Sequence, residues 1–301
     1  MLVKTDLLGI SITNASREEI LEYFVDLVEN TSQKILVTTP NPEMLVFAHK
    51  DKTFRKVLNS SQIALCDGVG VRVSSIILGK PLKERFAGVD FVESVCEKVV
   101  KKPITVGFLG GGPGVAEKAA ECLQTTYPGL AVVFAEAGNP DQKTAQNIQR
   151  LVKENAKHQT SKETEGAKGT EETNGTKEGD GVKKAQKLHQ EGSKNINSAI
   201  GETKIDILFV AFGFPKQERW IDEYKKQLPV KAFVTVGGSL DYISGAVQRA
   251  PGFVRSIGLE WLFRLIREPW RVKRQLALIV FMWLVLQEKF FSGRVKGKIK
   301  D

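Results

Sequence analysis

The chain has 301 residues, of which 42% are hydrophobic, and a formal net charge of +9. This length and composition allow one large α/β domain with an appendage, or two small domains, around a sizeable core. Residues 249–301 hold 12 Lys and Arg against 4 Asp and Glu, so almost all of the net positive charge lies in this segment and the rest of the chain is nearly neutral. This distribution argues against a nucleic-acid-binding surface and for one basic patch that meets an anionic partner.

The first predicted helix spans residues 15–30. Ser16 and Glu19 have the spacing of a capping box, and Ile20 and Phe24 begin an apolar stripe at helical spacing. The N-terminal sequence lacks the basic-then-apolar pattern of a secretory leader. The three cysteines, Cys66, Cys96 and Cys122, are far apart and match no metal-binding spacing. Together these features predict a reduced, cytoplasmic protein.

A short β-rich run, KILVTTPNPEM, is broken at its prolines, so Thr39 and Asn41 are expected at the end of a strand. A helix is predicted from Glu43 to Leu58. The apolar run that follows is read as a strand ending at Asp67, directly before Gly68. A carboxylate at the tip of a buried strand is costly unless a partner holds it or the protein uses it.

The same plan recurs three times further along the chain. ITVGFLGGGPG is a strand running into a glycine turn, followed by a helix and the strand LAVVFAEAG; IDILFVAFGFPKQERWIDEYKKQLP and VKAFVTVGGSLDYISG repeat it. Strands that alternate with helices predict a Rossmann-like, mostly parallel sheet flanked by helices, whose ligands bind beyond the carboxyl ends of the strands. The residues expected at such ends are Thr39, Asn41, Asp67, Gly110 and Gly213.

Residues 153–203 interrupt this plan. They contain no aromatic residue and few aliphatic ones, so they cannot bury enough apolar surface to offset the entropy lost on ordering. We interpret them as a disordered or loosely helical insertion, although a domain boundary is the alternative. The predicted organisation is a single α/β domain over 1–152 and 204–248, and a basic, aromatic-rich C-terminal helical appendage over 249–301.

Two glycine-containing turns are candidate nucleotide contacts. GFLGGGPG fits neither the dinucleotide fingerprint nor the P-loop, which argues against a dehydrogenase or an ATPase; it is either a tight turn or a phosphate cradle. In FGFPKQERW, Gln217 lies in the first turn of a helix. It is either a solvated polar residue or a group that bonds a nucleotide at the helix N-terminus.

Asp67 has two interpretations. It is a turn or helix-capping residue, as Asp-Gly pairs often are, or a general base that accepts a proton from a hydroxyl nucleophile held by Thr39 and Asn41. The histidines show no ligand spacing and the chain has no Asp-x-Asp, so no metal site is signalled. A metal-free transfer would need Arg or Lys to neutralise departing phosphates.

Seven segments resemble the WecG/TagA/CpsF glycosyltransferase family, in that family's order and over nearly all of 1–152 and 204–275. They are TPNPEM, LCDGVGV, LKERFAGVDF, GFLGGGPGVAEKAA, VAFGFPKQERWI, VGGSLDYISGAVQRAP and GLEWLFRLIREPWRVKR. The resemblance implies an inverting, metal-independent transferase without cofactor. Such an enzyme moves N-acetylmannosamine or its uronic acid from UDP to polyprenyl-diphosphate-linked N-acetylglucosamine, in the synthesis of surface polysaccharide or wall teichoic acid.

The resemblance also implies roles for single residues. Asp67 becomes the base, Thr39 and Asn41 lie beside the sugars, and Arg85 is a cation of the substrate pocket. The UDP site comprises Gly110, Gly213, Gln217 and, from a poorer local match, Glu136. The C-terminal arginines that would act in catalysis are Arg264, Arg271 and Arg274.

The tail combines these arginines with Trp261, Trp270 and Trp283. Its apolar stretch, residues 276–286, is too short to span a bilayer but suits a helix in the plane of an anionic membrane surface, or a helix pair packed on the core. We therefore expect a cytoplasmic enzyme, peripheral on the inner face of the membrane. A non-catalytic, membrane-recruited nucleotide-binding module and an oxidoreductase with an unusual dinucleotide loop are the alternatives, and a homo-oligomer stays open.

Overall fold

The computed structural model describes residues 1–166, 204–256, 258–269 and 272–296. Its centre is a six-stranded sheet in the order β4-β3-β8-β7-β5-β6, in which every pairing is parallel. The strands are β3 Ile35–Thr38, β4 Ile63–Ala64, β5 Val106–Gly110, β6 Val132–Glu136, β7 Ile205–Ala211 and β8 Val230–Thr235. The predicted mostly parallel sheet is confirmed, and the carboxyl ends of its strands lie along one edge.

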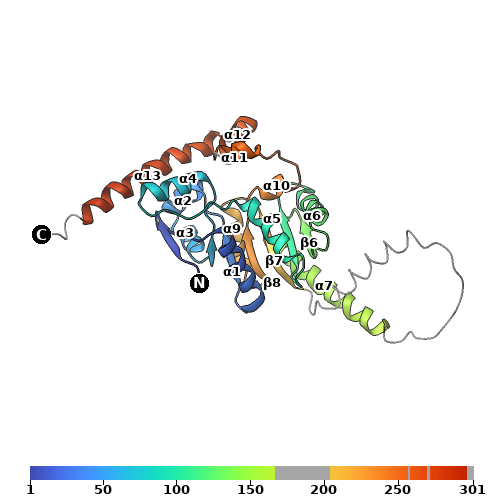
Figure 1. Cartoon of the computed structure of the whole chain (residues 1–301). Coiled ribbons are helices and arrows are strands. Elements are labelled where there is room, and N and C mark those ends of the chain that lie inside the picture. The colour runs from blue at the N-terminus through green and yellow to red at the C-terminus, as the bar shows by residue number, and fades with distance from the viewer. Residues whose placement is uncertain (167–203, 257, 270–271, 297–301) are drawn as a thin grey trace.

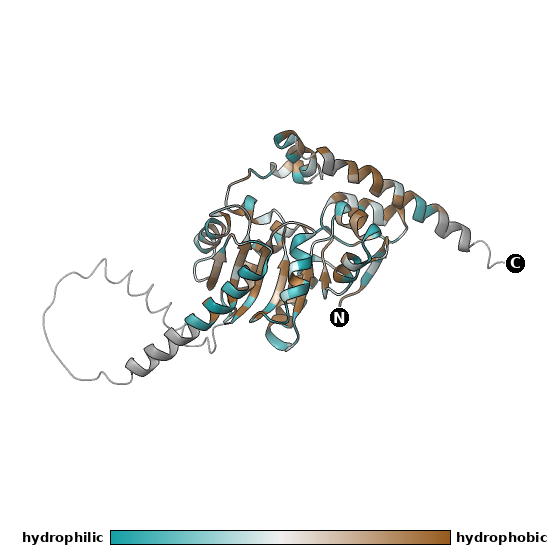
Figure 2. Ribbon diagram, turned by 180° about the vertical axis from the view of Figure 1, so that it is seen from behind, coloured by the Kyte–Doolittle hydropathy of each residue, from teal (hydrophilic) through white to brown (hydrophobic). Residues whose placement is uncertain are grey.

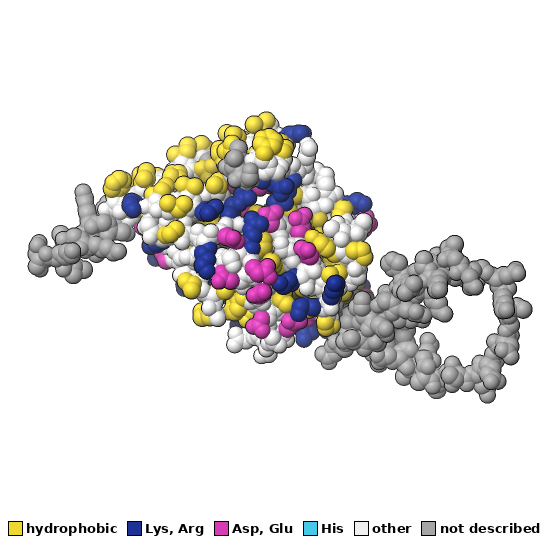
Figure 3. All heavy atoms as spheres, in the orientation of Figure 1, with side chains coloured by type: hydrophobic (Ala, Val, Ile, Leu, Met, Phe, Trp, Pro, Cys, Tyr) yellow, Lys and Arg dark blue, Asp and Glu magenta, His cyan; other side chains and the backbone are white. Residues whose placement is uncertain are grey.

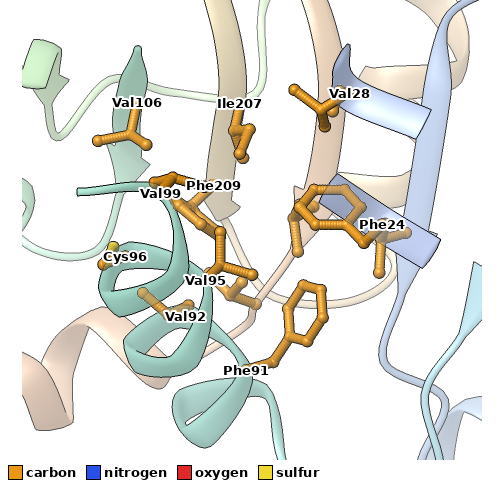
Figure 4. Close-up of a cluster of buried hydrophobic side chains, with 14 of the residues drawn as sticks. Phe24, Val28, Phe91, Val92, Val95, Cys96, Val99, Val106, Ile207 and Phe209 are labelled. Atoms are coloured by element: carbon orange, nitrogen blue, oxygen red, sulfur yellow. The ribbon is translucent and has the colours of Figure 1, made fainter. Parts of the chain in front are cut away.

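One face of the sheet is covered by α1 Arg17–Asn30, α5 Gly88–Val99 and α6 Val115–Thr126 (Figure 1). Ser16 caps α1 in a capping box with Glu19, as the sequence predicts. Apolar side chains from these helices meet the sheet, where Phe24 and Phe91 pack with ring centroids 5.4 Å apart (Figure 4). This interdigitated core fixes the position of the sheet's carboxyl-end edge.

The opposite face is covered by α7 Gln142–Gly166 and α9 Lys216–Tyr224. Trp220 of α9 and Ile148 of α7 are buried against Leu208 and Phe233 of the central strands. Helices on both faces bury most of the sheet, although the edge strand β6 stays partly exposed, which explains why the central strands read as apolar runs rather than as alternating patterns. Helix α7 continues past residue 152, so the start of the predicted insertion is helical; residues 167–203 lie outside the described residues.

A third cluster joins both ends of the chain at the β4 side of the sheet. The antiparallel hairpin of β1 Lys4–Leu7 and β2 Ile10–Thr13 packs with α2 Pro42–Lys50, α3 Lys52–Asn59 and α4 Val69–Ile77. Helix α13 Val272–Lys296 lies across α2 and α4 and buries Phe281, Leu284 and Val285 in this cluster. Figure 1 shows the helix reaching over the blue and cyan N-terminal elements. Part of the C-terminal tail therefore belongs to the hydrophobic core.

Short helices α10 Ser239–Ile243, α11 Gly252–Ser256 and α12 Glu260–Arg267 connect the sheet to α13. The helices expected in the C-terminal appendage are thus present. None of the described helices is both long and apolar enough to cross a membrane. Brown, hydrophobic positions fill the middle part of α13 in Figure 2, consistent with a helix that is apolar on more than one side there.

The single helix predicted from Glu43 to Leu58 is wrong. Asp51 ends α2 and begins α3, because its side chain accepts a hydrogen bond from the backbone N–H of Phe54, at 2.8 Å. A short acidic side chain of this kind competes with helix continuation. The strand expected to end at Asp67 is also shorter, since β4 stops at Ala64 and leaves Asp67 in a loop.

Candidate active site

A cavity of about 620 Å³ opens beyond the carboxyl ends of β3, β4, β7 and β8, beneath α12 and α13. Its walls come from segments far apart in the sequence, which the parallel topology brings to one edge. The predicted site residues that line it are Thr39, Asn41, Asp67, Arg85, Gly213, Gln217 and Arg264.

Asp67 occupies the loop between β4 and α4. Its backbone N–H donates to the carbonyl of Pro40 at 3.2 Å, which ties this loop to the one after β3. The N-cap of α4 is Gly68, with φ near +90°, and no side chain caps the helix. The Asp67 carboxylate therefore does not cap α4, which rules out the helix-capping interpretation of this residue. The carboxylate lines the cavity instead.

Burial raises the pKa of Asp67 to about 7. The neighbouring Arg85 guanidinium and the backbone N–H of Gly88 oppose this shift, whereas the charges of Glu260 and Asp90 add to it. A carboxyl group with a pKa near neutrality is a better proton acceptor than an ordinary aspartate and is still substantially ionised at pH 7. The environment of Asp67 is therefore suited to general-base chemistry.

Thr39 and Asn41 face the same cavity, but both side chains also support the fold. The hydroxyl of Thr39 donates to the backbone carbonyl of Thr235 at 3.1 Å, between β3 and β8. Asn41 is the N-cap of α2, with its side-chain oxygen accepting from the N–H of Met44 at 3.0 Å. The oxygen of Thr39 and the amide nitrogen of Asn41 remain as groups that a substrate hydroxyl can meet.

Among the described residues, two arginines line the cavity. Arg85 follows the turn after α4, and its side chain makes no hydrogen bond or ion pair with any other residue in the described part of the chain. Arg264 of α12 donates to the Tyr242 hydroxyl and to Glu268, each at 3.0 Å, and lies 4.9 Å from the centroid of the Tyr242 ring. These contacts hold the Arg264 guanidinium beside α10.

An ion network that sequence analysis did not predict fixes α12 above the cavity. Arg249 bonds Asp90 at the start of α5 and contacts Glu260 at the start of α12, at 3.4 Å. Arg17 adds a longer contact with Asp90, at 3.7 Å. Because Glu260 lines the cavity and its charge acts on Asp67, this network links the tail to Asp67. The partners are far apart in sequence, so no local pattern could have identified them.

Gln217 lies on α9, after the turn that contains Gly213. Its side-chain oxygen accepts from the N–H of Gly237 at 3.1 Å, and its amide nitrogen donates to the carboxyl of Glu218 at 2.7 Å. Glu218 itself is completely buried. Glu218 was not predicted as a site residue, because acidic residues are common in the first turn of a helix.

Gly110 and Glu136 lie outside the cavity lining. Gly110 ends β5 with φ near +106°, and a Cβ there would come 2.7 Å from the Ala211 backbone, so the site needs glycine for strand packing. Glu136 ends the edge strand β6 and accepts a hydrogen bond from Asn147 at 2.6 Å. Their assignment to a nucleotide site stays a prediction. Arg271 and the side chain of Arg274 lie outside the described residues.

Comparison with known proteins agrees with the family resemblance found in the sequence. A sequence model of the WecG/TagA/CpsF glycosyl transferase family matches residues 5–160 and 173–295. The chain is 29% identical over 287 residues to an N-acetylglucosaminyldiphosphoundecaprenol N-acetyl-beta-D-mannosaminyltransferase of Bacillus spizizenii, covering 93% of this chain and 92% of that protein. Proteins of the same name from Bacillus subtilis and Staphylococcus aureus are 27% and 26% identical, over 89% and 95% of this chain and 87% and 93% of their own lengths.

Proposed function

The chain belongs to the WecG/TagA/CpsF family of glycosyltransferases, and we propose that it transfers N-acetylmannosamine, or a close relative of that sugar, from UDP to N-acetylglucosamine linked through diphosphate to a polyprenyl lipid. The names of its relatives in Bacillus and Staphylococcus support this acceptor and this sugar. The product would be an early intermediate of a cell-surface polysaccharide or teichoic acid.

The observation that carries the proposal is the Asp67 carboxyl, which lines the cavity with a pKa raised to about 7. In the proposed step, Asp67 takes the proton of the acceptor hydroxyl while that oxygen attacks the anomeric carbon. The bond from this carbon to the phosphate oxygen breaks, and UDP leaves with the electron pair from the opposite face. The configuration at the anomeric carbon is therefore inverted.

Arg85 and Arg264 would stabilise the charge that develops on the departing diphosphate. Both guanidinium groups line the cavity that contains Asp67. Fixed cations aimed at a developing negative charge are an established source of rate enhancement, and they can supply the charge that a divalent metal supplies elsewhere. The proposal therefore includes transfer without a metal.

The lipid acceptor requires that the cavity lie near a membrane surface. The exposed apolar side chains that support this geometry belong to α4 and to the segment from α11 to α13: Val73, Ile76, Phe253, Leu259, Trp261, Ile266, Leu276, Ile279, Val280, Met282, Trp283, Leu286 and Phe290. In Figure 3 they form a yellow edge with Lys and Arg beside it. We propose that this edge, called the apolar edge below, rests on the anionic inner face of the cell membrane.

The experiment is a UDP-release assay with UDP-N-acetylmannosamine and a lipid-diphosphate-N-acetylglucosamine analogue. We expect UDP release that requires the acceptor and persists when EDTA removes divalent cations. Binding of UDP without release would favour a non-catalytic nucleotide-binding module instead. Release without acceptor would indicate hydrolysis, and loss of release in EDTA would contradict metal-free transfer.

A further inference from the structure

Glu218 is a buried acid that the proposed transfer step does not use. It lies in the first turn of α9, and none of its surface is exposed. Removing a carboxyl group from water is costly unless other groups compensate. The helix N-terminus provides part of that compensation. The rest must come from its contacts, which lead directly to the cavity.

Two contacts fix the orientation of the Gln217 amide. Its Nε2 donates to Glu218 Oε1 at 2.7 Å, and its Oε1 accepts from the backbone N–H of Gly237 at 3.1 Å. The Gly237 N–H can only donate, so it requires the amide oxygen, and the nitrogen must then face Glu218. An amide rotated by half a turn would place two donors together at Gly237.

This orientation leaves the Gln217 amide with a donor, rather than an acceptor, to offer a ligand. Gln217 lines the cavity, and one of its two Nε2 hydrogens goes to Glu218. The other has no acceptor among the residues that the structure describes. An amide N–H held in this way suits an oxygen of the donor nucleotide, in its uracil, ribose or phosphate groups.

The same contacts extend to the tail arginine. Gly237 and Gly238 form the turn before α10, which the Gln217 oxygen anchors. A Cβ on Gly238 would come 3.1 Å from Arg264 Nη1, so the guanidinium lies directly on this turn. Loss of the Gln217 orientation would therefore loosen the surface on which Arg264 rests.

The second carboxyl oxygen of Glu218, Oε2, indicates which protonation state of the carboxyl fits these contacts. Its Oε2 and the hydroxyl of Thr235 are both buried and have no hydrogen-bond partner among the described residues. Burial raises the pKa of Glu218 to about 7, although the hydrogen bonds from Gln217 and from the Glu218 backbone N–H oppose the shift. A neutral carboxyl can carry its proton on Oε2 and keep Oε1 as the acceptor for Gln217. Glutamine would reproduce this arrangement.

We propose that Glu218 is a positioning residue that holds the Gln217 amide with its N–H toward the UDP moiety of the donor and, through Gly237, steadies the turn beneath Arg264. The proposal rests on the proposed function, because it takes UDP as the group that Gln217 meets. Glu218 itself contacts no substrate in this scheme.

A double-mutant cycle tests the proposal. Calorimetry would measure the affinity for UDP of the full chain, of Gln217→Leu, of Glu218→Leu and of the double variant, and thermal melting would report folding. We expect Glu218→Leu to weaken UDP binding about tenfold and Glu218→Gln to stay within about twofold of the native affinity. In the Gln217→Leu background, Glu218→Leu should cause no further loss, because residues that act as one unit are not additive.

Additive losses, or a Glu218→Gln variant as weak as Glu218→Leu, would overturn the proposal. If Glu218→Leu does not fold, Glu218→Asp replaces it in the cycle, since its carboxyl is one methylene too short to meet Gln217 in the same way. Absence of UDP binding to the native chain would contradict the proposed function itself. Native binding with additive losses would contradict only the role of Glu218.

Discussion

Asp67 has the properties of a base because of what surrounds it rather than because of its type. An exposed aspartate is a weak base, but burial at the cavity raises the pKa of this one to about 7. The positive charge of Arg85 stabilises the ionised form of Asp67, and the negative charge of Glu260 destabilises it. The balance depends on residues from three separate parts of the chain.

Replacing Asp67 with Asn should lower turnover by about 10²–10⁴-fold, the usual contribution of a general base. The side chain keeps its size, so UDP affinity should stay close to native. Turnover with saturating donor and acceptor, together with calorimetry for UDP, provides the measurement. Near-normal turnover would leave Asp67 as a loop residue only.

The pH dependence of kcat/KM should report the same group. The base must be ionised, so activity should rise with pH through about 7, the raised pKa of Asp67. Arg85 lowers the pKa of Asp67, so Arg85→Gln should move the acid limb of the profile to higher pH. Glu260 raises that pKa, so Glu260→Gln should move the limb to lower pH. Shifts in the same direction would show that another group titrates.

The residues that line the cavity were easier to predict from the sequence than the residues packed behind them. Asp67, Arg85, Gln217 and Arg264 belong to segments that resemble the family, and all four line the cavity. Glu218, Arg249 and Glu260 were missed. Their importance depends on burial and on partners such as Asp90, 159 positions from Arg249, which local spacing does not reveal.

At the scale of elements, α12 and α13 combine two roles. One side of α13 completes a core cluster through Phe281, Leu284 and Val285, while side chains such as Ile279 remain exposed. Removing the whole tail would therefore expose apolar surface on α2 and α4 as well as abolish its contacts with the cavity. Point substitutions separate these effects.

Arg264→Ala should lower turnover about 10²-fold on a soluble acceptor analogue, because it removes a fixed cation from the cavity. Arg267→Ala is the matched control on the same helix. Arg267 bonds Gln248 at 2.8 Å and lies 5.5 Å from the centroid of the Phe263 ring, outside the cavity lining. Equal effects of the two substitutions would mean that α12 contributes only through its fold or its attachment.

Ile279→Glu on the apolar edge should weaken binding to vesicles of anionic lipid roughly tenfold, since a charge replaces an apolar side chain at the membrane interface. Ile279 is 69% exposed, and Val3 is equally exposed. The control is Val3→Glu, close to the N-terminus, which Figure 1 shows on the side of the molecule away from α13. Turnover on a soluble acceptor should not change in either variant. Equal vesicle binding of both would place the membrane contact elsewhere.

Local signals predicted the elements wherever one physical cause dominated. The capping box at Ser16 and the apolar runs of the buried strands correctly located α1 and the sheet. The break at Asp51 was missed because one side-chain cap outweighed a continuous helical pattern. The partly buried α13 was ambiguous, since apolar residues at helical spacing fit a core and a membrane surface equally well.

At the scale of the whole molecule, residues 158–200 should be dispensable. The described residues that tie α7 to the sheet come from its first half, including Ala145 and Ile148. Replacing 158–200 with a short flexible linker should preserve the melting temperature and UDP affinity, because loop length affects closure entropy only slowly. A deletion of 142–200 is the contrasting variant and should destabilise the fold. Unfolding of the shorter deletion would show that the segment packs.

The topology explains why these distant residues meet in one place. A parallel sheet brings the loops after β3, β4, β7 and β8 to one edge, and the tail closes that edge from above. The proposed base, the cations and the proposed nucleotide contacts therefore come from different segments around one cavity. We propose that this cavity performs an inverting transfer in which Asp67 is the base.

The most direct test is the anomeric configuration of the product, measured by proton NMR after incubation with an α-linked UDP sugar and the lipid-diphosphate-N-acetylglucosamine analogue. We predict a β-linked disaccharide from the native chain, in agreement with the name of its relatives, and at least a hundredfold slower formation of it by Asp67→Asn. An α-linked product, or a β-linked product formed equally fast without the Asp67 carboxylate, would contradict the account.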